Sequence, residues 1–345
     1  MNSPYRSSSR RSRRTLALAL LIGAGALLCL ALGLGLGWLL FGRNGDSQQA
    51  AVPTAAAPSA AQAIAPTATL VATPAVVSQP TSIVLLQPPD LPALQALALE
   101  LVNQDRAAAG LQPVEWDATA ARLAQAHAED MLVGQFFSHW NRDGYGPDHR
   151  AALLAGSSDA VFENIHAFGM RFDDGRPAPI EEWPQRVREA QAGWMQSPGH
   201  RDNILDPAHT HVGVGIAYRP EIGELRLVQE FVNRYVALAP LPAEAAPGAE
   251  WPLEGRLGAG ASDPIVNLAY EPFPQPLTPA QLAATSAYRS PAVTFAAPAV
   301  QVDGERFQAR LRFDHEPRPG LYHVRVFVTV AGQPVLAASP IVVVR

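Results

Sequence analysis

The chain has 345 residues, no Lys and a single Cys, Cys29, and these counts exclude several kinds of chemistry. Without Lys there is no Schiff-base nucleophile, no Ser-Lys dyad and no P-loop lysine. With one Cys, no disulfide can form within the chain. Residues 91–237 carry 12 Arg against 20 Asp and Glu, and this acidic balance argues against nucleic-acid binding by that region.

The N-terminus combines a basic segment with a long apolar run. Residues 1–15 include five Arg, and residues 16–41 contain no charge. A helix of these 26 residues would be about 39 Å long, which is enough to cross a bilayer core of about 30 Å with some tilt. The run is longer than that of a cleaved signal peptide. We therefore predict a single-pass anchor in the cell membrane, with residues 1–15 cytoplasmic and the remaining domains extracytoplasmic.

Residues 42–89 follow as a tether rich in Ala, Pro and Thr. The segment has no charge between Asp46 and Asp90 and shows no helical periodicity, so we expect a partly extended linker.

Residues 90–237 show both helical and strand periodicities. Asp90 and Asp117 are typical helix N-caps, and each precedes a run with apolar residues on one face. Towards the end of the region the period changes to the alternation of an antiparallel hairpin. We predict an α+β domain, with helices at 91–109, 118–133, 147–155 and 180–196 and strands at 211–218 and 225–233.

The C-terminal region reads as all-β. Residues 238–254 are rich in Pro and Ala and are interpreted as a second linker. Residues 255–345 contain two runs of strict alternation, at 305–313 and 321–330, which predict a small immunoglobulin-like sandwich that folds independently. His323 within this region is interpreted as a surface residue.

Four motifs in residues 91–237 occur in a fixed order. They are "FSHWNRDG" (137–144), "EN" (163–164), "WMQSPGHRDNIL" (194–205) and "HVGVG" (211–215). This order resembles the bacterial SCP-like branch of the CAP superfamily, the group of cysteine-rich secretory, antigen 5 and pathogenesis-related proteins. The Cys pairs of the secreted animal and plant members are missing.

The resemblance implies an α-β-α sandwich with a central cleft. His139, Glu163 and His200 match the cleft positions of the family, whereas Ser197 stands where eukaryotic members carry a second Glu. We expect the Pro-Gly pair before His200 to end the fourth helix and turn this side chain into the cleft. Two other His receive structural interpretations: His127 as a packing residue of the second helix and His149 as a loop residue.

Two functions remain open for this cleft. The first is a binding module, in which His139, Glu163, His200 and Ser197 contact a lipid, a glycan, a wall fragment or a protein. The second is a metal-assisted, peptidase-like hydrolase, in which His139, Glu163 and His200 are catalytic and bind Zn²⁺ or another divalent cation. A third hypothesis gives the tethered domains a purely structural role. The sequence does not decide whether the chain is an enzyme.

Overall fold

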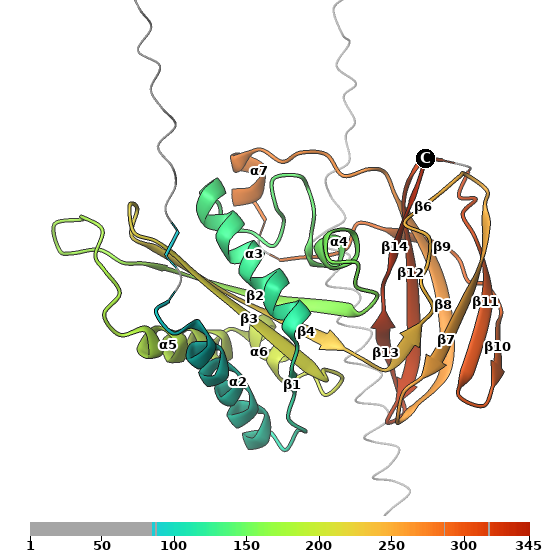
Figure 1. The fold of residues 1–345 in the computed structure, drawn as a ribbon, viewed down its shortest axis with the longest axis horizontal. Helices are drawn as coiled ribbons and strands as arrows, with labels where there is room; N and C mark the ends of the chain where they lie inside the picture. Colours follow the sequence, from blue (N-terminus) through green and yellow to red (C-terminus); the bar gives the residue numbers. More distant parts are fainter. Residues whose placement is uncertain (1–84, 87, 286, 317) are drawn as a thin grey trace, which may run out of the picture. The chain divides into compact units, whose positions relative to one another are not determined.

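Figure 1 shows the fold as a computed structural model, which describes residues 85–345 apart from residues 87, 286 and 317. The predicted basic segment and membrane anchor, and the predicted linker up to residue 84, lie outside the described residues. Within the described part of the chain, no helix is both long enough and apolar enough to cross a bilayer. The described residues belong to one compact unit.

The first half of this unit, residues 85–233, is a four-stranded sheet between two helical layers (Figure 1). The strand order is β1-β3-β4-β2, with β1 parallel to β3 and the other pairs antiparallel. Helix α3 covers one face, and α2 and α5 cover the other. This content confirms the predicted α+β class. The elements are α2 (Leu91–Ala108), β1 (Glu115–Trp116), α3 (Ala118–Gly134), α4 (Pro147–His149) continued by a π-helical turn (Arg150–Leu154), β2 (Ala160–Gly169), α5 (Trp183–Gln196), α6 (Pro198–Ile204), β3 (His211–Arg219) and β4 (Glu224–Asn233).

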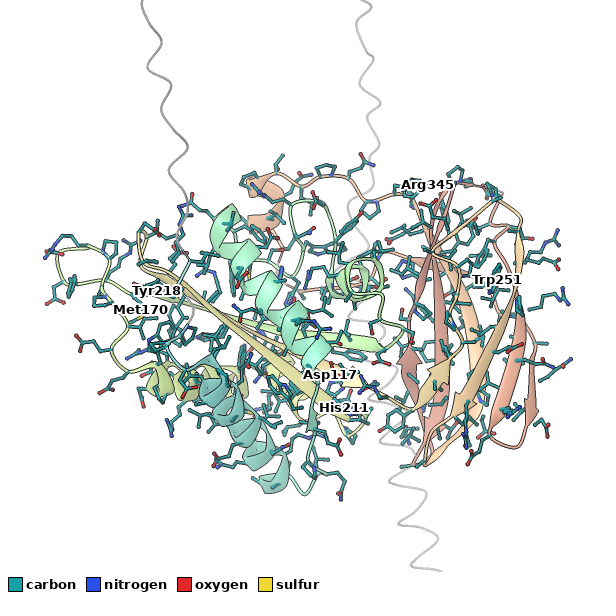
Figure 2. The ribbon with its side chains drawn as sticks, viewed as in Figure 1. Asp117, Met170, His211, Tyr218, Trp251 and Arg345 are labelled. Carbon is teal, nitrogen blue, oxygen red and sulfur yellow. The ribbon has the colours of Figure 1, made fainter. Side chains whose placement is uncertain are left out.

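Both helix starts that the sequence predicts are capped as expected. The Asp90 side chain accepts a hydrogen bond from the Ala93 amide at 3.1 Å. Asp117 accepts one from the Ala120 amide at 2.6 Å, and it lies beside His211 at the start of β3 (Figure 2). Each cap satisfies an amide that has no partner within the helix.

Strand β3 packs against α3 at very short range. Its alternate residues face opposite helical layers, so Val214 joins the core under α2 and α5, while Gly213 and Gly215 face α3. A Cβ atom at either glycine would come within 3.0 Å of the backbone of Ala121 or Ala124. The "HVGVG" motif therefore brings the helix backbone onto the strand, which no larger residue permits.

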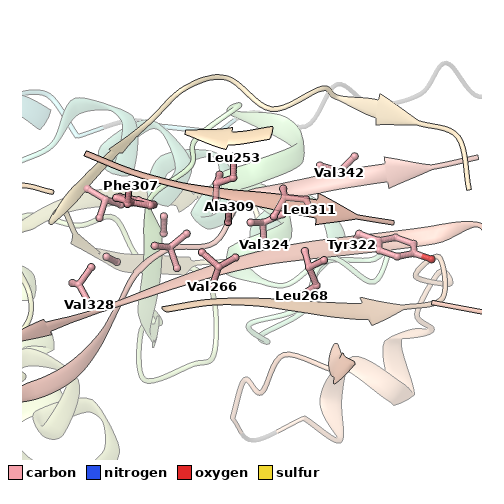
Figure 3. Close-up of a cluster of buried hydrophobic side chains, with 14 of the residues drawn as sticks. Leu253, Val266, Leu268, Phe307, Ala309, Leu311, Tyr322, Val324, Val328 and Val342 are labelled. Atoms are coloured by element: carbon pink, nitrogen blue, oxygen red, sulfur yellow. The ribbon is translucent and has the colours of Figure 1, made fainter. Parts of the chain in front are cut away.

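The second half, residues 236–345, consists mainly of two sheets packed face to face. One has the order β10-β11-β7-β5, and the other has β6-β14-β12-β8-β9 with β13 paired to β12. Leu253 and Phe307 of the first sheet meet Leu268 and Val324 of the second in a common core (Figure 3). The elements are β5 (Val236–Leu238), β6 (Glu244–Ala245), β7 (Glu250–Leu257), β8 (Ala261–Glu271), α7 (Pro279–Ala283), β9 (Val293–Ala296), β10 (Val300–Asp303), β11 (Arg306–Arg312), β12 (Gly320–Val330), β13 (Gln333–Ala338) and β14 (Ile341–Val344).

The predicted linker at 238–254 is not a linker in the structure. It contains β6 and most of β7, and Leu253 is fully buried in the sandwich core. The Pro-rich composition masks a short alternation in which Leu253 and Leu257 point inward. A chain cut at residue 255 would therefore lose most of a core strand. The immunoglobulin-like topology stays a prediction.

A segment of the second half returns to the first. After β8 the chain leaves the sandwich, and residues 272–285 and 287–292, here called the strap, contact the first half before β9. Leu282 of α7 is fully buried in the core beneath α3. The Leu277 amide donates to the Arg142 carbonyl at 2.7 Å, and the Ser138 and Thr285 hydroxyls are 2.6 Å apart. The two halves are thus interlocked rather than joined by one connection.

The close approach of α3 to β3 generates a first prediction. Gly213→Ala or Gly215→Ala should each lower the free energy of unfolding by about 3 kcal/mol or more, because the added methyl group must push the α3 backbone off the sheet. Gly169→Ala at the end of β2 is the matched control, since its Cβ would meet nothing within 4 Å. Urea titration of the three variants measures the difference. Equal midpoints for Gly215→Ala and Gly169→Ala would contradict the packing described.

Candidate functional site

His139 lies in the loop after α3, and Arg150 fixes that loop. The buried Arg150 guanidinium donates to the carbonyl oxygens of His139 at 2.7 Å and Tyr145 at 3.3 Å. The Asn141 side chain accepts from the amides of Asp143 and Tyr145 within the same loop. The "SHWNRDGYG" sequence therefore folds as a turn organised by Asn141 and closed by one buried cation.

Glu163 occupies the middle of β2 and is almost fully buried, with 1% of its side chain exposed. Its Oε1 atom is 2.8 Å from His139 Nδ1, and its Oε2 atom accepts from Arg150. Burial alone would raise the pKa of this carboxyl, but the charge of Arg150 holds the pKa well below its usual range. Glu163 is therefore ionised, and it orients the His139 ring.

A second buried carboxyl group, Glu230, faces Glu163 across the β2–β4 pair. Its nearer oxygen lies 3.6 Å from Arg150, and among the described residues neither oxygen has a hydrogen-bond partner. Burial, and then the charge of Glu163, raise the pKa of Glu230 well above its usual range, so its surroundings favour the neutral, protonated form. The sequence did not predict Glu230 as a site residue. Its neighbour Glu163 lies on β2, a strand that was not predicted, so the pairing of the two residues could not be seen.

His200 lies inside a helix rather than after one. Ser197 is both the C-cap of α5 and the N-cap of α6, and Pro198 occupies the first turn of α6. The Pro-Gly pair predicted to end a helix thus begins the next helix. Proline suits this position, because the first turn of a helix does not need its missing amide proton. The side chain of His200 is half-buried. Burial, and then the nearby His139 imidazole, lower the pKa of His200.

Polar neighbours hold α6 in position. Asn164 donates to the His200 carbonyl at 3.2 Å and accepts from Asn203 at 3.1 Å. His209 Nε2 lies 3.0 Å from Asn203 Oδ1. The Asn residues of the "EN" and "GHRDN" motifs therefore tie α6 to β2.

The structure brings together two of the three predicted metal ligands. His139 and Glu163 are in contact, but His200 does not complete a group whose donor atoms converge. Within the described part of the chain, the one His, Cys, Asp and Glu group with donor atoms within 4.8 Å of one another is His149, Glu271 and His323. Glu163 already contacts His139 and Arg150, and metal binding by His139, Glu163 and His200 stays a prediction.

Two pockets meet at the cleft histidines. The larger has a volume of about 740 Å³ and the smaller about 340 Å³, and His139 and His200 line both. Ser197 lines the larger pocket, as predicted for a ligand-contacting residue. Part of that wall comes from the second half, through Arg325 and Phe327. Sequence reasoning assigned the sandwich no part in the cleft, since the motifs end before it begins.

The family comparison agrees with this arrangement. The model of the cysteine-rich secretory protein family, CAP, matches residues 99–231. Residues 99–231 therefore form a CAP domain. YkwD of Bacillus subtilis is 31% identical to it over 144 residues, which are 41% of this chain and 48% of the relative. YlbC of the same organism, named a membrane protein, is 36% identical over 120 residues, which are 34% of this chain and 30% of the relative. The chain thus spans less than half the length of these relatives.

Among solved structures, an extracellular protein containing a SCP domain from Bacillus anthracis is similar to this chain. The identity is 24% and the TM-score is 0.33, and the match covers 43% of this chain and 45% of the other.

The unequal charge states of the two buried carboxyl groups generate a second prediction. Glu163→Gln should lower the free energy of unfolding by roughly 3–5 kcal/mol, because it leaves the Arg150 cation buried without its partner. Glu230→Gln should cost roughly 1 kcal/mol or less, since it replaces a neutral group by a neutral isostere. Chemical denaturation at neutral pH compares the two. A larger loss for Glu230→Gln would mean that the charges are assigned the wrong way round.

A third prediction concerns acid stability. Burial, followed by the charge of Arg150, lowers the pKa of His127 to about 4. The unfolded value is about 6.5, so the unfolded chain binds more protons between these two values. The stability that His127 contributes is therefore complete above pH 6.5 and is lost as the pH falls towards 4.

Between pH 7.5 and pH 5 this loss should amount to about 2 kcal/mol for His127. His127→Gln keeps a donor for the Ser138 carbonyl, which His127 Nε2 contacts at 2.9 Å, but it cannot titrate. Denaturation curves at several pH values should show a shallower pH dependence for the variant. Parallel curves for the two proteins would rule out this assignment.

Proposed function

We propose that the CAP domain and the sandwich together form an extracytoplasmic binding module, and that its ligand occupies the pocket beside His139 and His200. The observation that carries this proposal is the pocket of about 740 Å³, a volume typical of small-molecule sites, which range from about 300 to 1,000 Å³. Both predicted histidines lie where this pocket meets the smaller one.

The walls of the pocket indicate the chemistry of the ligand. Phe162 and Phe327 offer half-buried apolar surface, while the half-buried Arg325 offers hydrogen-bond donors. Such a wall suits a molecule with both apolar and polar groups, such as a wall fragment, a glycan or the head region of a lipid. A protein ligand would insert one side chain or a short loop. The membrane-protein name of YlbC is consistent with the proposed anchor at residues 16–41 and with an extracytoplasmic ligand.

A hydrolase is the alternative, and one contact favours it. Glu163 holds His139 through Nδ1 at 2.8 Å, which is how a carboxylate orients an imidazole that acts as a general base. The other ring nitrogen of His139 would then take a proton from a water molecule that attacks the bound ligand. This form of the alternative uses the His139–Glu163 pair, and the metal-assisted form would in addition need a divalent ion shared by His139, Glu163 and His200.

The fourth prediction tests the pocket directly. Soluble peptidoglycan fragments and vesicles of phosphatidylglycerol, offered separately to the full-length chain in detergent or nanodiscs, should show binding to one of the two probes. The His139→Gln, His200→Gln double variant should bind that probe at least about tenfold more weakly, because a lost hydrogen bond to a buried partner costs about 1–3 kcal/mol.

His211→Gln is the matched control, since His211 is also half-buried but lies outside the pocket. Equal binding by the double variant and the control would refute the pocket assignment. Mass spectrometry of the recovered fragments separates the two functions: intact fragments support a binding module, and cleavage that the double variant lacks supports the hydrolase.

A further inference from the structure

Three side chains far apart in the sequence meet where the sandwich contacts the CAP domain. His149 ends α4 of the CAP domain, Glu271 ends β8, and His323 lies near the start of β12. Their side chains are 0%, 3% and 0% exposed. The expectation that His323 is a surface residue is therefore wrong, as is the loop interpretation of His149. The burial of two imidazoles and a carboxylate at one place needs a physical explanation, because burying such groups is unfavourable unless they are paired.

The donor atoms of the three residues point at a common centre. His149 Nε2 and His323 Nε2 both contact Glu271 Oε1, the second at 2.9 Å, and one donor atom from each residue lies within 4.8 Å of the others. Around a tetrahedral Zn²⁺ with bonds of about 2.0–2.1 Å, neighbouring ligand atoms stand roughly 3.3 Å apart. An ion would therefore require the Glu271 oxygen to withdraw from both imidazoles.

A second carboxylate stands behind both imidazoles. Asp148 Oδ1 is 3.1 Å from His149 Nδ1, and Asp148 Oδ2 is 3.8 Å from His323 Nδ1. The Tyr288 hydroxyl, which belongs to the strap, donates to Asp148. A carboxylate behind the outer nitrogen is the usual neighbour of a metal-binding His, since it keeps the proton on that nitrogen and leaves the inner one free for the ion.

The charges in this cluster also favour a cation. Asp148 and Glu271 bring two negative charges. Burial opposes a charge on His149, but its contacts with these two carboxylates raise its pKa to about 9, so without an ion one proton offsets part of their charge. His323 Nδ1 has no hydrogen-bond partner among the described residues. A divalent ion would balance the carboxylates and leave a proton on each Nδ1 for Asp148. The Gly146 amide, 3.1 Å from His149 Nδ1, is the contact that opposes this tautomer and would have to shift.

We propose that His149, His323 and Glu271 bind one divalent transition-metal ion, best matched by Zn²⁺, which fastens the sandwich to the CAP domain. Two His and one carboxylate are a frequent ligand set of Zn²⁺. The near-complete burial of the ligands suits a structural site. One tetrahedral position remains for a water molecule or for the second oxygen of Glu271. The three ligands do not line the cleft pocket, although Asp148 behind them does, and the proposal does not depend on the proposed function.

The fifth prediction is tested on the full-length chain, stripped with a chelator and titrated with Zn²⁺ and with Co²⁺, whose visible absorption reports a four-coordinate site. The wild type should bind an ion at this site and melt at a higher temperature with Zn²⁺ present, because the ion binds the folded chain. The His139→Gln, His200→Gln double variant should keep one equivalent. His323→Gln should bind at least about 100-fold more weakly, since second-shell changes alone weaken binding by about 10–100-fold.

Asp148→Asn provides a second readout if His323→Gln does not fold, which circular dichroism will show. It keeps all three ligands and removes the charge behind them, so binding should weaken by roughly 10–100-fold. A wild type that takes up no ion would overturn the proposal. The proposal would also be overturned if the cleft double variant lost the ion while His323→Gln or Asp148→Asn bound it as tightly as the wild type.

Discussion

The position of the cleft depends on one buried cation. Arg150 follows α4 directly, pairs with Glu163 on the central sheet and donates to two carbonyls of the His139 loop. It therefore fixes, at once, the strand that carries the carboxylate and the loop that carries the imidazole. A buried cation is tolerable only when it is paired, and here the pairing determines the geometry of the site. Glu230 remains neutral beside it because the one positive charge is already matched by Glu163.

The sequence predicted the parts of the fold whose signals are local. Asp90 and Asp117 start helices, and both act as caps, because capping involves residues only three positions apart. Strand β2 was not predicted, because Glu163, Asn164 and His166 interrupt its apolar character and its partner residues on β4 are 55 to 73 positions away. Residues 238–254 were misassigned for the same reason: the pairing that makes β7 a strand is with β11, distant in the sequence.

For the site, motif order identified the pair that meets, His139 and Glu163, and placed His200 and Ser197 on the same pocket. Motif order could not predict which residues surround this pair. Glu230 becomes visible only through strand register, and Arg325 and Phe327 only through contact with the sandwich. His149 and His323 look unremarkable in the sequence, because 173 positions separate them and no spacing rule connects them. Such residues can be recognised as a possible metal site only once the tertiary structure shows that they are buried together.

The strap has a consequence for how the protein is made. The ribosome delivers the chain from its N-terminus, and domains generally fold as units when complete. Here the CAP sheet ends at Asn233, yet the core beneath α3 is filled by Leu282. A nascent CAP domain must therefore wait for much of the sandwich to be synthesised, with apolar surface around Met131 still open. A premature stop before Leu282 would release a CAP domain with an unfinished core, a substrate for chaperones and proteases rather than a smaller working protein.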